Sequence, residues 1–358
     1  MSEFGSNIKI SVFGESHGEG IGAVIDGIPA GFRLDTDKIL AQMARRAPGR
    51  DKTATPRVEK DFPRILSGVL NGVTTGAPLA CLIENTNTKS GDYKNLLEIP
   101  RPGHSDYTAY VKYNGCNDIR GGGHFSARLT APIVFAGAVI RQILESKGIK
   151  IAAHIASIGN VSDERFNPVE IGEELTDRLN TESFALIDKS KESAMRDEVA
   201  RAQKDGDSVG GVVECAVVGM PVGVGGPLFD GIEGQIAKAV FAIPAVKGVE
   251  FGVGFECAKL RGSENNDPYI IKDGGVATKT NNSGGILGGI SSGMPIIFRA
   301  AFKPTPSIAK EQDSVNLGAM ENTKLSVRGR HDPCIVPRAV SVTEAMAAIA
   351  VYDMLGEK

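Results

Sequence analysis

The stretch ARLTAPIVFAGAVIRQILESK at residues 127–147 decides the fold. It is as long as a major helix, and it is followed by Gly148, a residue type that commonly succeeds a helix C-terminus. Its apolar residues fall on nearly every side of the helix, so the helix must be covered from several directions. Antiparallel sheets packed around central helices would provide that cover. The sequence therefore predicts an α+β fold.

Three other segments predict helices, at 37–46, 230–243 and 342–355. The first can be capped by Thr36 or Asp35, and the last follows a capping box made by Ser341 and Glu344. Glycine accounts for 44 of the 358 residues and separates short apolar runs such as IKISVF (8–13), a pattern typical of short strands joined by turns. Because no linker-like stretch interrupts the chain, we expect one domain over 1–358.

The composition argues against several classes of protein. The net charge is −3, Trp is absent and aromatic residues make up 6%, so we expect neither nucleic-acid nor membrane binding. The N-terminal stretch MSEFGSNIKISVFGESHG has no apolar run of signal-peptide length, and we find no run of about 18 apolar residues that would span a membrane. The five cysteines form no C-x-x-C pair, which disfavours a metal site or a disulfide framework and favours a cytoplasmic location.

The five histidines give the first indication of function. Four of them lie among Gly, Ser, Arg and Asp, in the motifs GESHG (14–18), RPGHSDY (101–107), IRGGGHFSAR (119–128) and RGRHDPC (328–334). Histidine can deliver protons near neutral pH, and arginine binds phosphate or carboxylate. These motifs therefore suggest one site for a small anion, assembled from distant segments. His154 lies in an apolar, strand-like run and is interpreted as structural.

Several motifs have a second interpretation that is purely structural. The basic stretch MARRAPGRDK (43–52) is either an anion site or a solvated helix end. The glycines of 121–123 either bind an anion at the start of the long helix or form a closely packed turn. FKPTPS (302–307) is either a phosphate contact or a stiff loop. Two further segments are given a structural interpretation alone: NNSGGILGGISSG (281–293) is interpreted as a glycine-rich strand, and 163–177 as solvated surface.

Taken together and in this order, GESHG, RRAPGR, RPGHSDY, RGGGHFSAR, GGILGGISSG, KPTPS and RGRHDPC resemble the chorismate synthase family over residues 10–355. The resemblance implies conversion of 5-enolpyruvylshikimate 3-phosphate to chorismate, by trans-1,4-elimination of phosphate, in the shikimate pathway of aromatic amino-acid biosynthesis. It also implies reduced FMN as cofactor, a β-α-β sandwich with central helices covered by antiparallel sheets, and a homotetramer.

The resemblance also implies roles for individual residues. His17 would donate a proton or hydrogen bond to the flavin, His104 would be the general acid for the leaving phosphate, and Asp332 would assist proton handling. The substrate would be held by Ser16, Arg46, Lys52, Arg101, Arg128 and Arg330. FMN would be held by His124, Phe125, Ser126, Pro244, Ala245, Gly288, Lys303, Pro304, Thr305, Pro306, Ser307 and Arg330. No metal is implied.

The chain departs from the family pattern at several of these positions. Ala47 and Lys52 stand where arginine is common, and Pro244 stands where asparagine is common. In the glycine motif, His124, Phe125 and Leu129 replace Arg, Ser or Ala, and Glu. We hypothesise that His124 compensates for the missing arginine as a weaker donor to the flavin.

Two other classes of protein remain open from the sequence. One is a flavin-dependent oxidoreductase that uses the same pocket for hydride transfer, and the other is a non-catalytic anion-binding protein. Some relatives reduce their own flavin with NADPH, but no extra segment is evident here, so we expect an external source of reduced FMN. We also expect the loops at 45–60 and 305–330 to become ordered when FMN binds.

Overall fold

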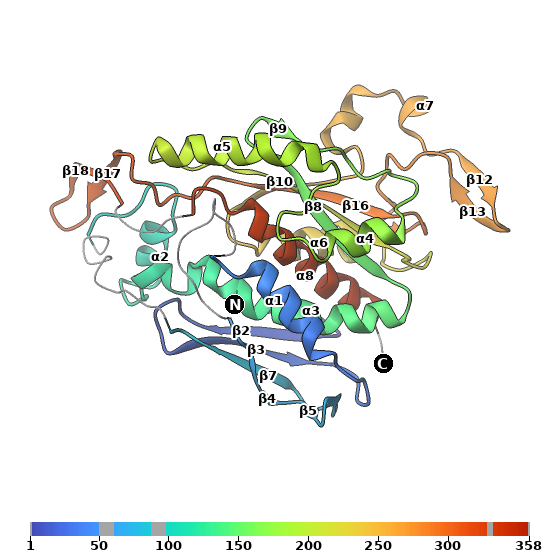
Figure 1. Cartoon of the computed structure of the whole chain (residues 1–358), viewed down its shortest axis with the longest axis horizontal. Helices are drawn as coiled ribbons and strands as arrows, with labels where there is room; N and C mark the ends of the chain where they lie inside the picture. The colour runs from blue at the N-terminus through green and yellow to red at the C-terminus, as the bar shows by residue number, and fades with distance from the viewer. Residues whose placement is uncertain (1, 50–60, 87–97, 328–331, 357–358) are drawn as a thin grey trace.

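In the computed structural model, which describes residues 2–49, 61–86, 98–327 and 332–356, two antiparallel sheets enclose a layer of helices (Figure 1). The predicted α+β sandwich, with central helices covered by antiparallel sheets, is confirmed. Lys52, Arg330 and His331, which the sequence analysis singled out, lie outside the described residues.

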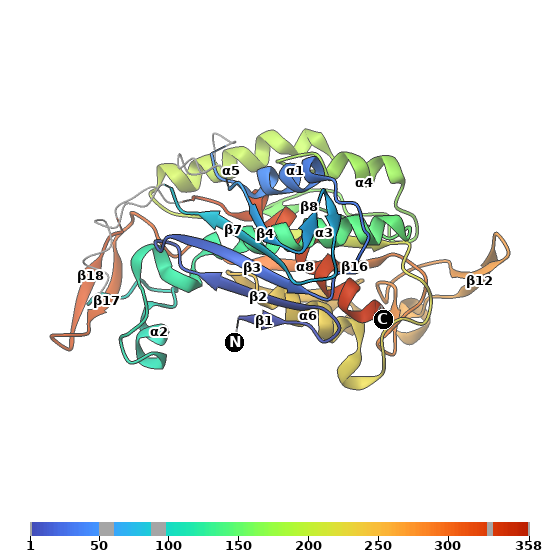
Figure 2. The ribbon, with the colours of Figure 1, turned by 90° about the horizontal axis from the view of Figure 1, so that it is seen from below.

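The first sheet has the strand order β1-β2-β3-β7-β4 and forms the face seen in front in Figure 2. Its strands are β1 (Glu3–Phe4), β2 (Lys9–Gly14), β3 (Gly20–Asp26), β4 (Arg64–Ser67) and β7 (Leu79–Glu84). The apolar residues of β3 and β7 alternate, so one face of the sheet is buried against the helices. A small hairpin of β5 (Val69–Leu70) and β6 (Val73–Thr74) extends from the edge strand.

The second sheet has the strand order β11-β16-β10-β8-β9 and lies on the other side of the helices. Its strands are β8 (Lys150–Ile158), β9 (Val161–Ser162), β10 (Gly211–Val218), β11 (Val246–Phe251) and β16 (Ile296–Phe302). The central strands β8, β10 and β16 are buried along most of their length. Helix α5 (Glu192–Lys204) contacts β8 from the outer side of this sheet (Figure 1). Helix α4 (Glu173–Leu179) also contacts β8, and its last residue, Leu179, accepts a hydrogen bond from Arg45 of the central layer.

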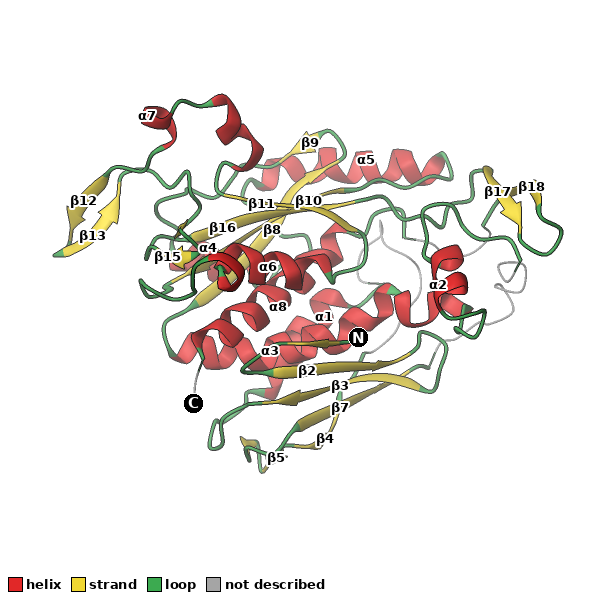
Figure 3. Ribbon diagram, turned by 180° about the vertical axis from the view of Figure 1, so that it is seen from behind, coloured by secondary structure: helices red, strands yellow, loops and turns green. Residues whose placement is uncertain are grey.

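The central layer contains α1 (Thr36–Arg46), α3 (Thr130–Ser146), α6 (Ile232–Phe241) and α8 (Val336–Leu355), which Figure 3 shows between the two sheets. Helix α3 packs on the first sheet and on α8, and α8 packs on the second sheet. A 3₁₀ turn at Ala127–Leu129 precedes α3. The segment Ala127–Ser146 is long and apolar enough to cross a membrane, but 89% of it is buried, as expected of a core helix.

The predicted helices at 37–46, 127–147 and 230–243 are therefore confirmed, with Asp35 rather than Thr36 capping α1. The capping box at Ser341 and Glu344 is wrong. Helix α8 begins at Val336, with Pro337 in its first turn, so both residues lie inside the helix. Glu344 is completely buried and pairs with two arginines, which explains why a glutamate stands in an apolar run.

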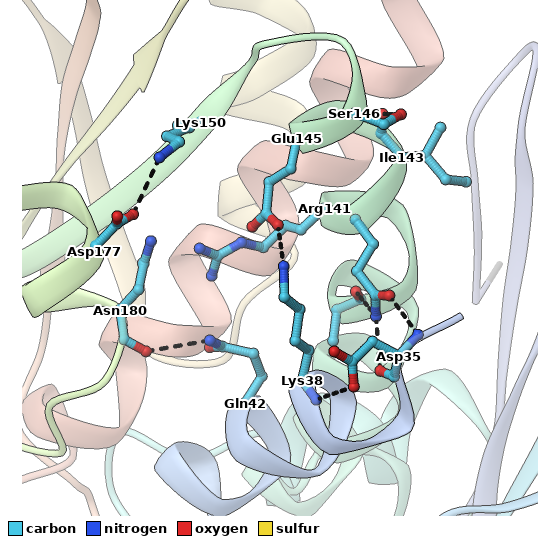
Figure 4. Close-up of polar contacts among 12 residues, drawn as sticks. Asp35, Lys38, Gln42, Arg141, Ile143, Glu145, Ser146, Lys150, Asp177 and Asn180 are labelled. Atoms are coloured by element: carbon cyan, nitrogen blue, oxygen red, sulfur yellow. Dashed lines mark hydrogen bonds and ion pairs between the residues drawn. The ribbon is translucent and has the colours of Figure 1, made fainter. Parts of the chain in front are cut away.

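Helix α1 is attached to its neighbours by polar contacts that surround the apolar core (Figure 4). Lys38 pairs with Glu145 of α3 at 3.0 Å, and Gln42 donates to the carbonyl of Asn180 after α4. In addition, the amide of Asp35 donates to Gln142 of α3. The contacts of Asp35 and Lys38 fix the N-terminal part of α1, and that of Gln42 fixes the turn before its last residues, Arg45 and Arg46.

Several elements were not predicted. These are α2 (Asp106–Lys112), α7 (Gly262–Asn265), and the hairpins of β12 (Tyr269–Lys272) with β13 (Gly275–Thr278) and of β17 (Gln312–Asn316) with β18 (Glu321–Leu325). The glycine-rich strand predicted at 281–293 is a short hairpin of β14 (Ile286–Leu287) with β15 (Ile290–Ser291). The prediction that 163–177 is solvated surface is partly wrong, because the side chain of Asp163 and the residue Phe166 are buried against His154.

Candidate active site

A cavity of about 540 Å³ opens at one end of the sandwich and is lined by segments that are far apart in the sequence. Its volume is within the range of about 300–1,000 Å³ found for small-molecule sites. Of the residues predicted to be functional, its lining includes Arg101, His104, His124, Phe125, Ser126, Pro244, Ala245, Lys303, Thr305, Pro306, Ser307 and Asp332. Most of the motifs therefore do meet at one place.

Two predicted catalytic histidines lie against consecutive glycines of the 3₁₀ turn Arg120–Phe125. A Cβ atom on Gly121 would lie 2.5 Å from Cδ2 of His17, and one on Gly122 would lie 3.3 Å from Nε2 of His104. Both glycines have positive φ, at 60° and 84°. The turn thus needs glycine both for its backbone conformation and for the space that the imidazoles occupy. Of the two interpretations of 121–123, the structure supports the closely packed turn, against which His17 and His104 lie.

Ser16 and His17 are more enclosed than their turn-forming sequence indicates. Ser16 is 1% exposed and His17 is 8% exposed, and the amide of Ser16 donates to the carbonyl of Gly123. Asn85, at the end of β7, donates to the carbonyls of Glu15 and Gly18 and so fixes this turn. The turn is therefore held in place from both sides before any ligand arrives.

The motif RPGHSDY forms a compact cluster of charges at the start of α2. Asp106 accepts two hydrogen bonds from the Arg101 side chain, at 2.7 and 2.8 Å, and one from its backbone amide. The same carboxylate lies 2.6 Å from Nδ1 of His104. Burial by itself raises the pKa of Asp106, but hydrogen bonds from Arg101 and His104 outweigh burial and lower that pKa well below its usual range.

Asp332 follows the undescribed residues 328–331 and faces the cavity just before α8. Its carboxylate pairs with Arg338 in the first turns of α8, and its carbonyl accepts from the hydroxyl of Thr305 at 2.8 Å. Arg338 also donates to the carbonyl of Arg46. The start of α8 thus connects Asp332 to the end of α1.

The two buried arginines that were expected to bind substrate share one carboxylate, that of Asp61. Arg46 pairs with Asp61 at 2.6 Å, and Arg128 pairs with the other oxygen of the same group. Burial lowers the pKa of Arg46 to about 10, although attraction to Asp61 opposes this. Burial raises the pKa of Asp61, but the two arginines lower it overall. Neither interpretation of 43–52 anticipated this: Arg45 and Arg46 are buried and paired, with Arg45 bound to Glu344.

The opposite wall of the cavity combines exposed rings with donors. Phe125 and Phe241 are 39% and 52% exposed there, which offers apolar surface to a flat ring system. Lys303 donates to the carbonyl of Gly103, and burial together with repulsion from Lys247 lowers the pKa of Lys303. Arg101 reaches Ser307 at 3.0 Å. Exposed rings and cationic or hydroxyl donors therefore line the same cavity.

His124 uses both ring nitrogens within the protein. Nδ1 lies 2.8 Å from the carbonyl of Gly14, and Nε2 lies 2.6 Å from the hydroxyl of Ser2. Since a carbonyl only accepts, Nδ1 carries the hydrogen. The ring therefore forms part of the cavity wall and joins β1 and β2 to it. This arrangement does not support the hypothesis that His124 replaces an arginine as a donor to the flavin.

Gly288 is the described candidate that lies apart from the others. It forms the turn between β14 and β15, beside the N-terminal end of α6, where the amide of Ile232 bonds to the carbonyl of Gly289. The cavity is at the opposite, Phe241 end of that ten-residue helix. The described residues include no cluster of three or more side chains suited to a metal ion.

Three residues in or beside this site escaped the sequence analysis: Asp61, Asp106 and Arg338. Asp106 could have been found, because an Arg, a His and an Asp lie within six residues in a motif already singled out. Asp61 ends the stretch TPRVEKD (55–61), whose interleaved charges indicate ion pairs with the preceding basic loop, but the sequence did not identify Arg46 and Arg128 as its partners. Arg338 follows Asp332 closely in the sequence, but its bond to the carbonyl of Arg46 joins segments that only the fold brings together.

Comparisons with known proteins point to one family. The family model for chorismate synthase matches residues 8–355. The chain is 48% identical over 351 residues to a chorismate synthase of Thermococcus kodakarensis, covering 98% of this chain and 96% of that protein. It is 49% identical over 351 residues to one of Pyrococcus abyssi, with the same shares covered. A crystal structure of chorismate synthase superimposes with a TM-score of 0.77 at 31% identity, covering 98% of this chain and 92% of the other.

Proposed function

The chain belongs to the chorismate synthase family, and we propose that His17, His104 and Asp332 carry out the family's reaction in the cavity at the end of the sandwich. The enzyme converts 5-enolpyruvylshikimate 3-phosphate to chorismate in the shikimate pathway, by elimination of phosphate, and uses reduced FMN. The observation that carries the proposal is the pair of imidazoles on Gly121 and Gly122 beside that cavity.

His104 is proposed as the general acid for the leaving phosphate. The carbon–oxygen bond to phosphate and a carbon–hydrogen bond across the ring break, and a second double bond forms, so the leaving oxygen gains a proton or a hydrogen bond while a ring proton is lost. Proton donation by a placed side chain contributes typically 10²–10⁴-fold to rate. Arg101, next to His104, supports the same phosphate through charge-assisted hydrogen bonds.

His17 and Asp332 are proposed to act beside the cofactor. His17, enclosed by the 14–18 turn and Gly121, would hold a hydrogen bond toward the cofactor's ring. Asp332, held by Arg338, would take part in moving the ring proton. Ser16, Arg46, Arg128 and, from the undescribed residues, Lys52 and Arg330 complete the proposed substrate site. Since Asp61 pairs with both Arg46 and Arg128, these arginines would contact substrate only if that pairing changes.

FMN would be held along the wall formed by 124–126, Pro244, Ala245 and 303–307, with Gly288 and Arg330 as further proposed contacts. When bound, reduced FMN supplies electron density that assists loss of the phosphate. The chain's own contribution is to exclude water with Phe125 and Phe241 and to place donors at Lys303, Thr305 and Ser307. Reduced FMN from an external source, with no direct use of NADPH, is part of the same proposal.

We also infer one domain over 1–358, a homotetramer and a cytoplasmic location. Exposed apolar side chains on projecting segments support assembly, among them Leu228, Phe229, Phe255 and Ile271. The second candidate function, a flavin-dependent oxidoreductase, would use the same cavity. It would be favoured by steady NAD(P)H consumption in the absence of the phosphorylated substrate.

The test is anaerobic turnover of 5-enolpyruvylshikimate 3-phosphate with photoreduced FMN, following chorismate absorbance and phosphate release together. We expect equal amounts of the two products, and we expect His104→Ala to lower kcat about 10²-fold or more. His154→Gln, which changes a buried histidine remote from the cavity, is the matched control and should keep kcat. Wild-type turnover by His104→Ala would reject His104 as the acid.

A further inference from the structure

We propose that Asp106 is a positioning residue that fixes the tautomer and orientation of His104, so that the proton available for transfer is carried on Nε2. This inference rests on the proposed role of His104 as general acid. It concerns a residue of the RPGHSDY motif that the reaction described above does not use. The starting observation is the 2.6 Å distance between Oδ1 of Asp106 and Nδ1 of His104.

The contacts around Nδ1 determine where its hydrogen goes. Nδ1 also lies 3.2 Å from Nη2 of Arg101 and 3.5 Å from the hydroxyl of Ser105. A guanidinium only donates, so its contact would require a bare Nδ1, whereas the carboxylate requires Nδ1–H. Nη2 already has an acceptor in Oδ1 of Asp106 at 2.8 Å. The shorter, charge-assisted contact with the carboxylate therefore prevails, and Nδ1 carries a hydrogen.

With Nδ1 assigned to Asp106, the other nitrogen faces the reaction. Nε2 and Cε1 are the His104 atoms nearest to the position of a Cβ on Gly122, and the residue lines the cavity. A neutral ring then has an acceptor at Nε2, and a charged ring has a transferable proton there. A buried carboxylate in this relation to a histidine also stabilises the charged ring without itself being protonated.

The surroundings hold the carboxylate itself in place. Asp106 is 7% exposed, and it accepts from the amide and the guanidinium of Arg101, which is anchored to Ser307. The other charged group nearby is Lys303, which donates to the carbonyl of Gly103 next to His104. The groups that face His104 are therefore one carboxylate in contact and two cations, of which Arg101 is already paired with that carboxylate.

The decisive variant is Asp106→Asn, compared with His104→Ala and the double variant at saturating reduced FMN. Asparagine can donate a hydrogen bond to Nδ1, which favours the neutral His104 tautomer that carries its hydrogen on Nε2. We expect kcat to fall about 10²-fold or more and the alkaline limb of the pH–rate profile to move to lower pH, because the charged ring loses its counter-charge. In the His104→Ala background, Asp106→Asn should lower kcat no further, since the two residues act as one unit.

Two further measurements separate positioning from a structural role. Asp106→Glu keeps the charge and should recover part of kcat. In ¹⁵N-histidine-labelled protein, whose His104 signal is identified by its loss in His104→Ala, the neutral ring should carry hydrogen on Nδ1 in the wild type and on Nε2 in Asp106→Asn. Asp163→Asn removes the carboxylate of another buried Asp–His contact, at 2.9 Å, and should reduce stability without changing the profile.

The outcomes are distinguishable. An Asp106→Asn enzyme that raises KM through Arg101 but keeps kcat, pH profile and tautomer would overturn the inference, as would an undiminished effect in the His104→Ala background. Wild-type turnover by His104→Ala would instead overturn the proposed function. In that case the ¹⁵N spectrum would still decide whether Asp106 sets the tautomer.

Discussion

At the scale of single residues, the site depends on a glycine whose missing side chain leaves room for a histidine. Gly121 leaves the space in which Cδ2 and Nε2 of His17 lie, and a Cβ there would be only 2.8 Å from the hydroxyl of Ser16. A non-glycine residue at φ +60° also costs roughly 1–2 kcal/mol in backbone energy. The position therefore carries two separate requirements, one for conformation and one for space.

These requirements can be separated with two alanine variants. Gly121→Ala should destabilise the protein by roughly 1–2 kcal/mol and also lower kcat about 10²-fold, because it displaces His17. Gly148→Ala has a similar φ of +79° but nothing within 4 Å of its Cβ, so it should lose stability only. Thermal unfolding and anaerobic turnover are the measurements. Equal activity of the two variants would show that His17 does not need this space.

At the scale of elements, the ends of the helices set the geometry. Helix α8 places Glu344 between Arg45 of α1 and Arg141 of α3, with the amide of Ala153 in β8 as a third donor at 3.0 Å. One buried carboxylate thereby joins three helices and the second sheet. Breaking such a pair leaves buried charge uncompensated and costs about 3–5 kcal/mol.

We therefore expect Glu344→Gln to lower the free energy of unfolding by about 3–5 kcal/mol, measured by urea denaturation. The matched control is Glu145→Gln, which breaks the solvent-exposed pair with Lys38 and should cost less than about 1 kcal/mol. Similar losses in the two variants would mean that the buried cluster is relaxed by water or by movement of the arginines.

The elements that the sequence predicted well are those whose own apolar residues indicate how they are buried. Helix α1 has an apolar face and a side-chain cap from Asp35, and α3 and α6 are long apolar runs, so their ranges were close. The start of α8 was missed because Ser341 and Glu344 imitate a cap, while Pro337 marks the true first turn. The site motifs were recognisable, but the roles of Asp61 and Arg338 were not, because Asp61 pairs with Arg46 and Arg128, and Arg338 bonds to the carbonyl of Arg46 in α1.

At the scale of the whole molecule, a second buried ionic network crosses the β8–β10–β16–β11 sheet. His154 lies between Asp163 and Glu214, at 2.9 and 3.0 Å, and Arg299 continues the chain from Glu214 to Glu250. Burial lowers the pKa of His154, but its two carboxylates outweigh burial and raise that pKa above 6.5. The pKa of Asp163, despite the opposing effect of burial, is lowered below 3.8 by His154 and backbone amides.

The raised pKa of His154 and the lowered pKa of Asp163 determine how the free energy of unfolding changes with pH. The contribution of His154 is complete below pH 6.5 and is lost as the pH rises through its raised pKa in the folded protein. The contribution of Asp163 is complete above pH 3.8 and is lost as the pH falls through its lowered pKa. We expect maximal unfolding free energy between these limits, and a decline on the alkaline side that His154→Gln removes. Parallel pH curves for the two proteins would contradict this assignment.

Helix α8 has a consequence for how the molecule is made. It is the last of the described elements to be synthesised, yet it stands between α3 and the second sheet, with Asp332 and the cavity-lining Ile335 just before its first turn. Until this helix has left the ribosome, α3 and the second sheet lack the element that packs between them. The core and the candidate cavity are therefore completed by the same event, and we expect a chain that stops before α8 to lack both.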